Sequence, residues 1–276
     1  MEKRIVISLL TIAAFVLSQN GGKILELFEW YAALDVPVKR VVYKTFWYIA
    51  FPLGVMGLFH GFRKIAAEAG LASRAAQGIG TGLVGTLPML LGAGLLVRFQ
   101  VQLDWMAILN GCLLAAVGEE ILYRAMLFGQ LFRHARWGFL WAGLASAVIF
   151  GTGHLYQGNE LGAMVGIFAV TFLGGMWFSW LYVEWGNNLW VPMSFHFFMN
   201  LSWTLFDVSD NALGTWAPNV FRAATIALSI ILTIRHKRKT GEAWVVKGRR
   251  WWSGKMPVSS AETTDNQSFN LKNTTV

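Results

Sequence analysis

Eight long apolar stretches dominate this sequence and separate its polar segments. A helix that crosses a bilayer needs about 20 mostly apolar residues, and it must satisfy its backbone polar groups internally. The chain is therefore expected to be an all-α, polytopic transmembrane helical bundle of about eight spans. The predicted spans are Ile5–Leu17, Thr45–Phe59, Ile79–Val97, Trp105–Phe132, Trp137–Gly153, Leu161–Trp185, Leu189–Phe206 and Asn219–Ile234.

The composition agrees with a membrane protein. Of the 276 residues, 55% are hydrophobic and only 14% are charged, whereas soluble domains carry about 25% charged residues. Gly78 and Gly82 have the GxxxG spacing that lets two helices pack closely. A single cysteine, Cys112, excludes an intrachain disulfide and a cysteine-rich zinc site, and we expect it to pack. We attribute the net charge of +8 to membrane-flanking loops and expect no nucleic-acid partner.

Lysine and arginine placement predicts the orientation. With eight spans and a cytoplasmic N-terminus, the inner segments hold eleven basic residues before residue 240 and the outer segments six. Because cytoplasmic loops carry the excess of positive charge, we expect both termini in the cytoplasm, in what we take to be a bacterial inner membrane. The inner residues are Lys3, Arg4, Arg63, Lys64, Arg74, Arg133, Arg136, Arg235, Lys237, Arg238 and Lys239; the outer ones are Lys23, Lys39, Arg40, Lys44, Arg98 and Arg222.

The two ends of the chain each allow two interpretations. The first apolar stretch, with Lys3 and Arg4 before it, fits a signal peptide, but we favour a retained anchor because no clear Ala-x-Ala site follows. Near the other end, Glu242–Met256 mixes basic residues with tryptophan, so it can lie on the anionic inner leaflet or form a solvated tail. From Pro257 onward the polar composition predicts disorder.

Two adjacent glutamates, Glu119 and Glu120, lie inside the fourth apolar stretch. A carboxylate at mid-bilayer depth costs roughly 2.5–3.5 kcal/mol, so the pair needs a compensating interaction or a function. Arg124 follows Glu120 at i, i+4, which puts both side chains on one helix face, where the guanidinium can hold the carboxylate ionised. Glu119 points about 100° away around the helix and is left to face another helix. A purely structural ion pair with a second, snorkelling acid is the alternative.

Further polar side chains lie in later apolar stretches. His154 ends the fifth stretch, and His196 and Asn200 lie at i, i+4 on one face of the seventh. An unpaired imidazole or amide is costly in apolar surroundings. We therefore expect Glu119, His154, His196 and Asn200 to meet in the core of the bundle and satisfy one another. Polar contacts that only hold helices together are the alternative.

Three motifs follow one another along these spans: Glu119-Glu120-x-x-x-Arg124, Phe150-x-x-x-His154 and His196-x-x-x-Asn200. Together they resemble the EExxxR, FxxxH and HxxxN signature of the CPBP family of intramembrane proteases. That family includes the CAAX prenyl endopeptidases and many bacterial bacteriocin-processing or immunity-type proteins. The resemblance covers about residues 105–206 and leaves the first three spans and the tail outside it.

The resemblance implies an intramembrane endopeptidase that hydrolyses a peptide bond of a membrane-associated protein or peptide. It implies that Glu119 is the general base that activates water and that His154 assists it. His196 and Asn200 would then stabilise the oxyanion of the tetrahedral intermediate, a role that suits N–H donors in a dry site. On this basis we divide the chain into N-terminal transmembrane helices (1–104), a catalytic transmembrane core (105–234) and a basic juxtamembrane segment with a cytoplasmic tail (235–276).

The same resemblance gives Glu120 and Arg124 a supporting role, in which they organise the site. Metal dependence is open, because two histidines and a glutamate can form a three-ligand zinc site with water in the fourth position. If zinc is present, its ligands would be Glu119, His154 and His196. The HExxH helix signature is absent from the sequence, and we favour a reaction without a cofactor.

Two other functions fit the same residues. A proton-coupled transporter would use the glutamate and the histidines as a relay, and a non-catalytic immunity or scaffold protein would keep them for packing. Serine and aspartyl intramembrane proteases fit worse, because no Gly-x-Ser-Gly-type loop occurs and Asp104 and Asp207 lie at span ends. The expected partners are the lipid bilayer and a membrane protein or peptide substrate.

Overall fold

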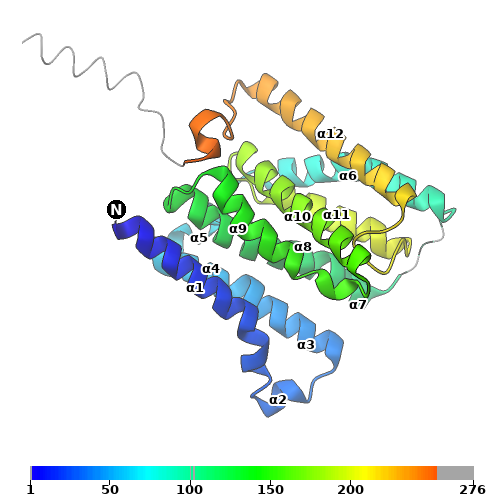
Figure 1. The fold of residues 1–276 in the computed structure, drawn as a ribbon, viewed down its shortest axis with the longest axis horizontal. Helices are drawn as coiled ribbons and strands as arrows, with labels where there is room; N and C mark the ends of the chain where they lie inside the picture. The colour runs from blue at the N-terminus through cyan, green and yellow to red at the C-terminus, as the bar shows by residue number, and fades with distance from the viewer. Residues whose placement is uncertain (1, 100, 102, 254–276) are drawn as a thin grey trace, which may run out of the picture.

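The computed structural model describes residues 2–99, 101 and 103–253, and these residues form helices and no strand (Figure 1). This confirms the all-α architecture expected from the apolar stretches. The predicted disordered segment from Pro257 lies outside the described residues.

Each of the eight predicted spans coincides with a helical segment. Seven of these segments are long and apolar enough to cross a membrane, and the remaining one, α11 (Trp190–Leu205), is shorter at 16 residues. Much of α11 is buried by its neighbours, so it need not present a full apolar length to lipid. The seven are Glu2–Leu25 (α1), Val36–His60 (ending in α4, Phe51–His60), Ala75–Leu96 (α6), Trp105–His134, Phe139–Gln157 (beginning with α9, Phe139–Thr152), Leu161–Glu184 (α10) and Trp216–Thr240 (α12).

The second span begins earlier than the sequence suggested. We expected it near Thr45, but α3 (Val36–Tyr43) continues into a π-helical turn, η1 (Lys44–Ala50), and then into α4. Pro37 lies in the first turn of α3, where its missing N–H leaves no hydrogen bond unmade. Lys44, which we counted among the outer-loop charges, is therefore part of a membrane span.

The fourth span, Trp105–His134, carries the paired glutamates and departs repeatedly from α-helical geometry. Glu119 is the last residue of α8 (Leu114–Glu119), and Glu120 is the first residue of a π-helical segment, η4 (Glu120–Phe128). Two further π-helical segments lie in the span, η3 (Ile108–Leu113) before α8 and η5 (Gln130–His134) at its end. Wide turns of this kind interrupt the regular i→i−4 hydrogen bonds and occur frequently at functional sites.

Close packing between α6 and α11 positions the second half of the site. A Cβ atom on Gly78 would lie 2.5 Å from Cβ of Trp190, and one on Gly82 would lie 2.4 Å from Cβ of Ser194. These distances are too short for two carbon atoms, so the helices can approach this closely only because both positions are glycine. The predicted role of the GxxxG pair is confirmed.

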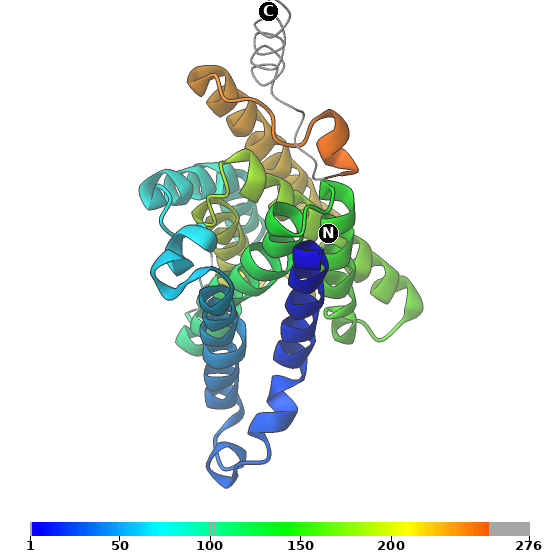
Figure 2. The same ribbon diagram turned by 90° about the vertical axis from the view of Figure 1, so that its left-hand side faces the viewer.

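The arrangement of the helices brings the two ends of the described chain to the same end of the bundle. In Figure 1 the N-terminus of α1 and the last turn of α12 both lie toward the left of the view. Figure 2 shows α1 and the α3–α4 segment as two legs at one edge, joined at their far ends through α2 (Glu29–Ala32). Large apolar side chains remain exposed along α1, α6 and α10, for example Leu9, Leu91 and Leu173, as expected of surfaces that face lipid.

The segment after the last span packs on the bundle. Val245 and Val246 donate their backbone N–H groups to the carboxylate of Glu184, the fully buried last residue of α10, at 3.0 and 2.8 Å. Trp251 packs against Phe139 with ring centroids 5.5 Å apart. Of the two interpretations of Glu242–Met256, a fully solvated tail does not fit these contacts, and a position on the inner leaflet stays a prediction. The docked residues nonetheless leave Trp252 exposed beside them.

Candidate active site

The two adjacent glutamates occupy different environments, as the sequence predicted. Glu120 is fully buried, and its Oε1 lies 3.0 Å from Nη1 of Arg124, which is also fully buried. The guanidinium lies over the rings of Phe150 and Phe178, at 4.6 and 5.2 Å from their centroids. The expected i, i+4 ion pair is present. Because both charges are away from water, each depends on the other for its stabilisation.

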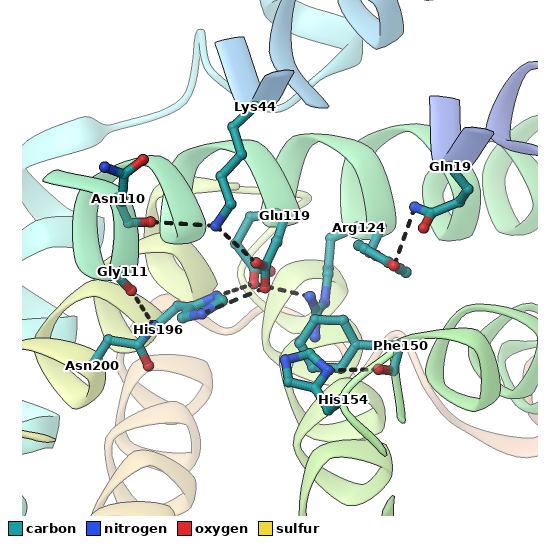
Figure 3. A network of polar contacts seen from close by, with 12 residues as sticks. Gln19, Lys44, Asn110, Gly111, Glu119, Arg124, Phe150, His154, His196 and Asn200 are labelled. Atoms are coloured by element: carbon teal, nitrogen blue, oxygen red, sulfur yellow. Dashed lines mark hydrogen bonds and ion pairs between the residues drawn. The ribbon is translucent and has the colours of Figure 1, made fainter. Parts of the chain in front are cut away.

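His196 connects the two glutamates. Its Nδ1 lies 2.8 Å from Oε1 of Glu120, and its Nε2 lies 3.8 Å from Oε2 of Glu119 (Figure 3). A carboxylate oxygen accepts, so Nδ1 carries a proton and donates to Glu120. This hydrogen bond fixes the ring and turns Nε2 toward Glu119.

Glu119 has a second partner, which we did not anticipate. Nζ of Lys44 lies 3.4 Å from Oε1 of Glu119 and donates to the backbone carbonyl of Asn110 at 3.3 Å. Lys44 and Glu119 lie 75 residues apart in sequence. The sequence signal for this contact was a lysine directly before a predicted span. Because the predicted span began at Thr45, Lys44 was assigned to the loop.

His154 and Asn200 do not hydrogen-bond to the other polar side chains of the site, so our expectation of mutual satisfaction is wrong for them. Nδ1 of His154 lies 2.7 Å from the backbone carbonyl of Phe150, and Nδ2 of Asn200 donates to the carbonyl of Gly111 at 2.8 Å (Figure 3). Both acceptors are backbone carbonyls of helical segments, Phe150 in α9 and Gly111 in the fourth span. Each keeps a free group, Nε2 of His154 and the second amide hydrogen of Asn200.

These side chains nevertheless line one cavity of about 820 Å³, which Glu119, His154, His196 and Asn200 all reach. Its remaining wall is largely apolar and includes Trp177. A smaller cavity of about 190 Å³ lies beside it and is richer in polar groups. The smaller cavity is lined by Gln19, Lys44, Tyr48, Glu119, Tyr123, Phe150, Gly153, His154 and Tyr156. Glu119 and His154 line both cavities.

The zinc ligand set considered from the sequence does not fit the geometry. A metal site requires ligand atoms that converge on one point about 2 Å from each. Among the described residues, the ligand atoms of Glu119, His154 and His196 do not all lie within 4.8 Å of one another. We therefore derive no step through a metal at this centre.

Comparison with known families agrees with the motifs. Residues 101–202 match the family model described as type II CAAX prenyl endopeptidase, Rce1-like. This segment contains all three motifs, from Glu119 to Asn200. No curated protein and no solved structure matches the chain. The matched segment and the motifs within it support the resemblance to the CPBP family of intramembrane proteases.

Proposed function

We propose that this protein is an intramembrane endopeptidase in which Glu119 activates water to cleave a peptide bond of a membrane-associated protein or peptide. The observation that carries the proposal is the position of Glu119 where the two cavities meet. The smaller, more polar cavity has room for several waters, since each takes up about 30 Å³ in the liquid. The larger, apolar cavity suits a segment of membrane peptide. Glu119 can thus receive water from one side and substrate from the other.

The hydrogen bonds support the remaining roles that we propose. In the attack, Glu119 takes a proton from water as the new C–O bond forms at the scissile carbonyl. Nδ1 of His154 is held by a carbonyl, so Nε2 keeps its lone pair and can share that proton. Asn200 has one N–H to spare for the oxyanion. His196 can donate a second from Nε2 only when its ring is doubly protonated, because Nδ1 already donates to Glu120. The proton on Glu119 then passes to the leaving amine as the C–N bond breaks.

We further propose a cytoplasmic N-terminus and C-terminus in a bacterial plasma membrane. The excess of basic residues in the segments that we take to be cytoplasmic supports this orientation. In this orientation the loops between α9 and α10 and between α11 and α12 are outside. Tyr156, Ser209 and Asp210 of these loops line the larger cavity. The substrate would therefore approach from the non-cytoplasmic side.

The experiment that tests the mechanism replaces Glu119 by glutamine, which keeps the size and removes the base. Membrane-fraction proteomics of cells with and without the active protein would first identify a cleaved substrate. We expect Glu119→Gln to lower its cleavage by about 10²- to 10⁴-fold, with unchanged thermal stability in detergent. Glu160→Gln, at an exposed glutamate outside the site, is the matched control.

Each alternative function predicts a different result. Cleavage at the wild-type rate by Glu119→Gln would rule out the assigned base. A transporter would show pH-dependent uptake in proteoliposomes and no cleaved product. An inert partner would retain its function in both Glu119→Gln and His154→Ala. Cleavage that survives treatment with a chelator would support a reaction without metal at this centre.

A further inference from the structure

A second polar cluster lies at the opposite end of the fourth span. His60 is the last residue of α4, Glu68 is the last residue of α5 (Ile65–Glu68), and His134 is the last residue of η5. His134 follows Glu119 by fifteen residues, which is roughly 22 Å along a helix axis. The cluster is therefore separate from the candidate active site.

The three residues meet closely. One ligand atom of each lies within 4.8 Å of the other two. Nε2 of His134 donates to Oε2 of Glu68 at 2.9 Å, so an ion must displace that proton or bind Nδ1, and the ring centroids of His60 and His134 lie 4.2 Å apart. Two ligands of a tetrahedral zinc ion stand roughly 3.3 Å apart, so shifts of about 1.5 Å or less would bring all three onto one ion. All three are partly exposed, which leaves an entry path from water.

Neighbouring groups orient the ligands as outer partners of a metal site do. Nε2 of His60 lies 2.7 Å from Oε1 of Gln130, an oxygen that only accepts. Nε2 therefore carries the proton and Nδ1 keeps the lone pair that a metal requires. Arg133 donates to the backbone carbonyl of Glu68 at 2.7 Å and to Oε2 of its carboxylate at 3.1 Å. The second carboxylate oxygen, Oε1, is left for an ion.

The protonation state of Glu68 suits a ligand. Nη2 of Arg133 lies 3.1 Å from Oε2 of Glu68, and a guanidinium at this distance keeps a carboxylate ionised. The carboxylate is therefore ionised at neutral pH. Two imidazoles and one carboxylate favour borderline divalent metals such as Zn²⁺ and Co²⁺ over Mg²⁺ or Ca²⁺. The adjacent guanidinium opposes a cation and should keep the affinity moderate.

We propose that His60, Glu68 and His134 form a binding site for a divalent transition metal, with water as the fourth ligand. The site joins the ends of α4, α5 and η5, so a bound ion would cross-link three segments of the N-terminal half. It lies on the helix that carries Glu119 but supplies no group to the cavities around it. Its role is therefore structural or regulatory, and the proposal is independent of the proposed protease activity.

The test is metal binding to the purified, chelator-treated protein in detergent. We expect one equivalent of Zn²⁺ by calorimetry, the visible absorption of four-coordinate Co²⁺, and a higher melting temperature with Zn²⁺ than with Mg²⁺. Glu68→Gln and His134→Gln should each weaken Zn²⁺ binding at least tenfold. The melting-temperature comparison uses the wild-type protein alone, so it holds even if a variant fails to fold.

Two controls locate the ion. His236→Gln removes another histidine that lies near a glutamate, with Nε2 of His236 3.6 Å from Glu242, and it should bind Zn²⁺ like the wild type. The double variant His154→Gln/His196→Gln should do the same, because both histidines lie outside the cluster of His60, Glu68 and His134. The proposal is overturned if the wild type shows no saturable binding. It is also overturned if the double variant loses the ion while Glu68→Gln and His134→Gln keep it.

Discussion

At the scale of single residues, the two neighbouring glutamates differ in burial, and therefore in how far each contributes to stability. Glu120 is locked between Arg124 and His196 away from solvent, whereas the side chain of Glu119 retains 14% of its exposure. A substitution at Glu120 or Arg124 therefore disturbs the folded state, and a substitution at Glu119 chiefly disturbs chemistry.

Removing the guanidinium tests this division. Arg124→Met leaves the carboxylate of Glu120 buried without its cation, and breaking a buried pair in this way costs roughly 3–5 kcal/mol. We expect a clearly lower melting temperature in detergent. The double variant Glu120→Gln/Arg124→Met removes both charges and should recover part of the loss. A melting temperature of Arg124→Met equal to that of the wild type would show that the pair contributes nothing to stability.

The ion pair that the sequence predicted and the one that it did not predict differ in the sequence distance between their two residues. Glu120 and Arg124 are four positions apart, so helical geometry alone predicts their contact. Lys44 meets Glu119 only because two spans pack side by side, and no periodicity within either span encodes that contact. The hydrogen bonds of His154 and Asn200 were missed for another reason, since each goes to a backbone carbonyl that every sequence offers.

At the scale of helices, the position of His196 and Asn200 on α11 depends on how closely α11 approaches α6. Apolar length predicted both helices, and the glycine spacing predicted a close helix contact on α6 without identifying α11 as its partner. The end of the second span was predicted to within one residue of His60, whereas its start at Val36 and the wide turns after Glu119 were not predicted, because both depend on packing against other spans.

A pair of glycines on α6 tests the importance of this approach. An added Cβ at Gly82 collides with Ser194, two residues before His196, whereas one at Gly80 meets nothing within 4 Å. We expect Gly82→Ala to cost about 1–3 kcal/mol through overpacking and to lower cleavage, because it displaces α11. Gly80→Ala makes the same chemical change on an open face and should leave both the melting temperature and cleavage near wild type. Equal behaviour of the two variants would argue against close packing as the constraint.

At the scale of the whole molecule, the orientation decides which compartment supplies the substrate. The charge asymmetry and the common end of the two termini favour a cavity that opens away from the cytoplasm. The apolar stretches predict about eight spans, but they do not indicate which loops lie over a cavity.

Cysteine labelling tests the orientation directly. The native thiol of Cys112 is buried, and a Cys112→Ala background carries no other cysteine. A membrane-impermeant maleimide should label Tyr156→Cys in intact cells and should label Lys64→Cys only after permeabilisation. Both positions are exposed in the folded protein. The reverse pattern would invert the proposed topology and with it the side from which the substrate enters.

The buried carboxylate of Glu184 has a consequence for how the protein is made. Its backbone donor Val245 follows it by 61 residues, so α10 is synthesised long before these hydrogen bonds can form. Until α12 brings Lys237, whose Nζ lies 3.4 Å from this carboxylate, the carboxylate must remain hydrated at the membrane surface, because an unpaired charge is too costly to bury. The two backbone N–H groups arrive later still, so the burial of Glu184 is completed only after α12 and the segment that follows it have been made.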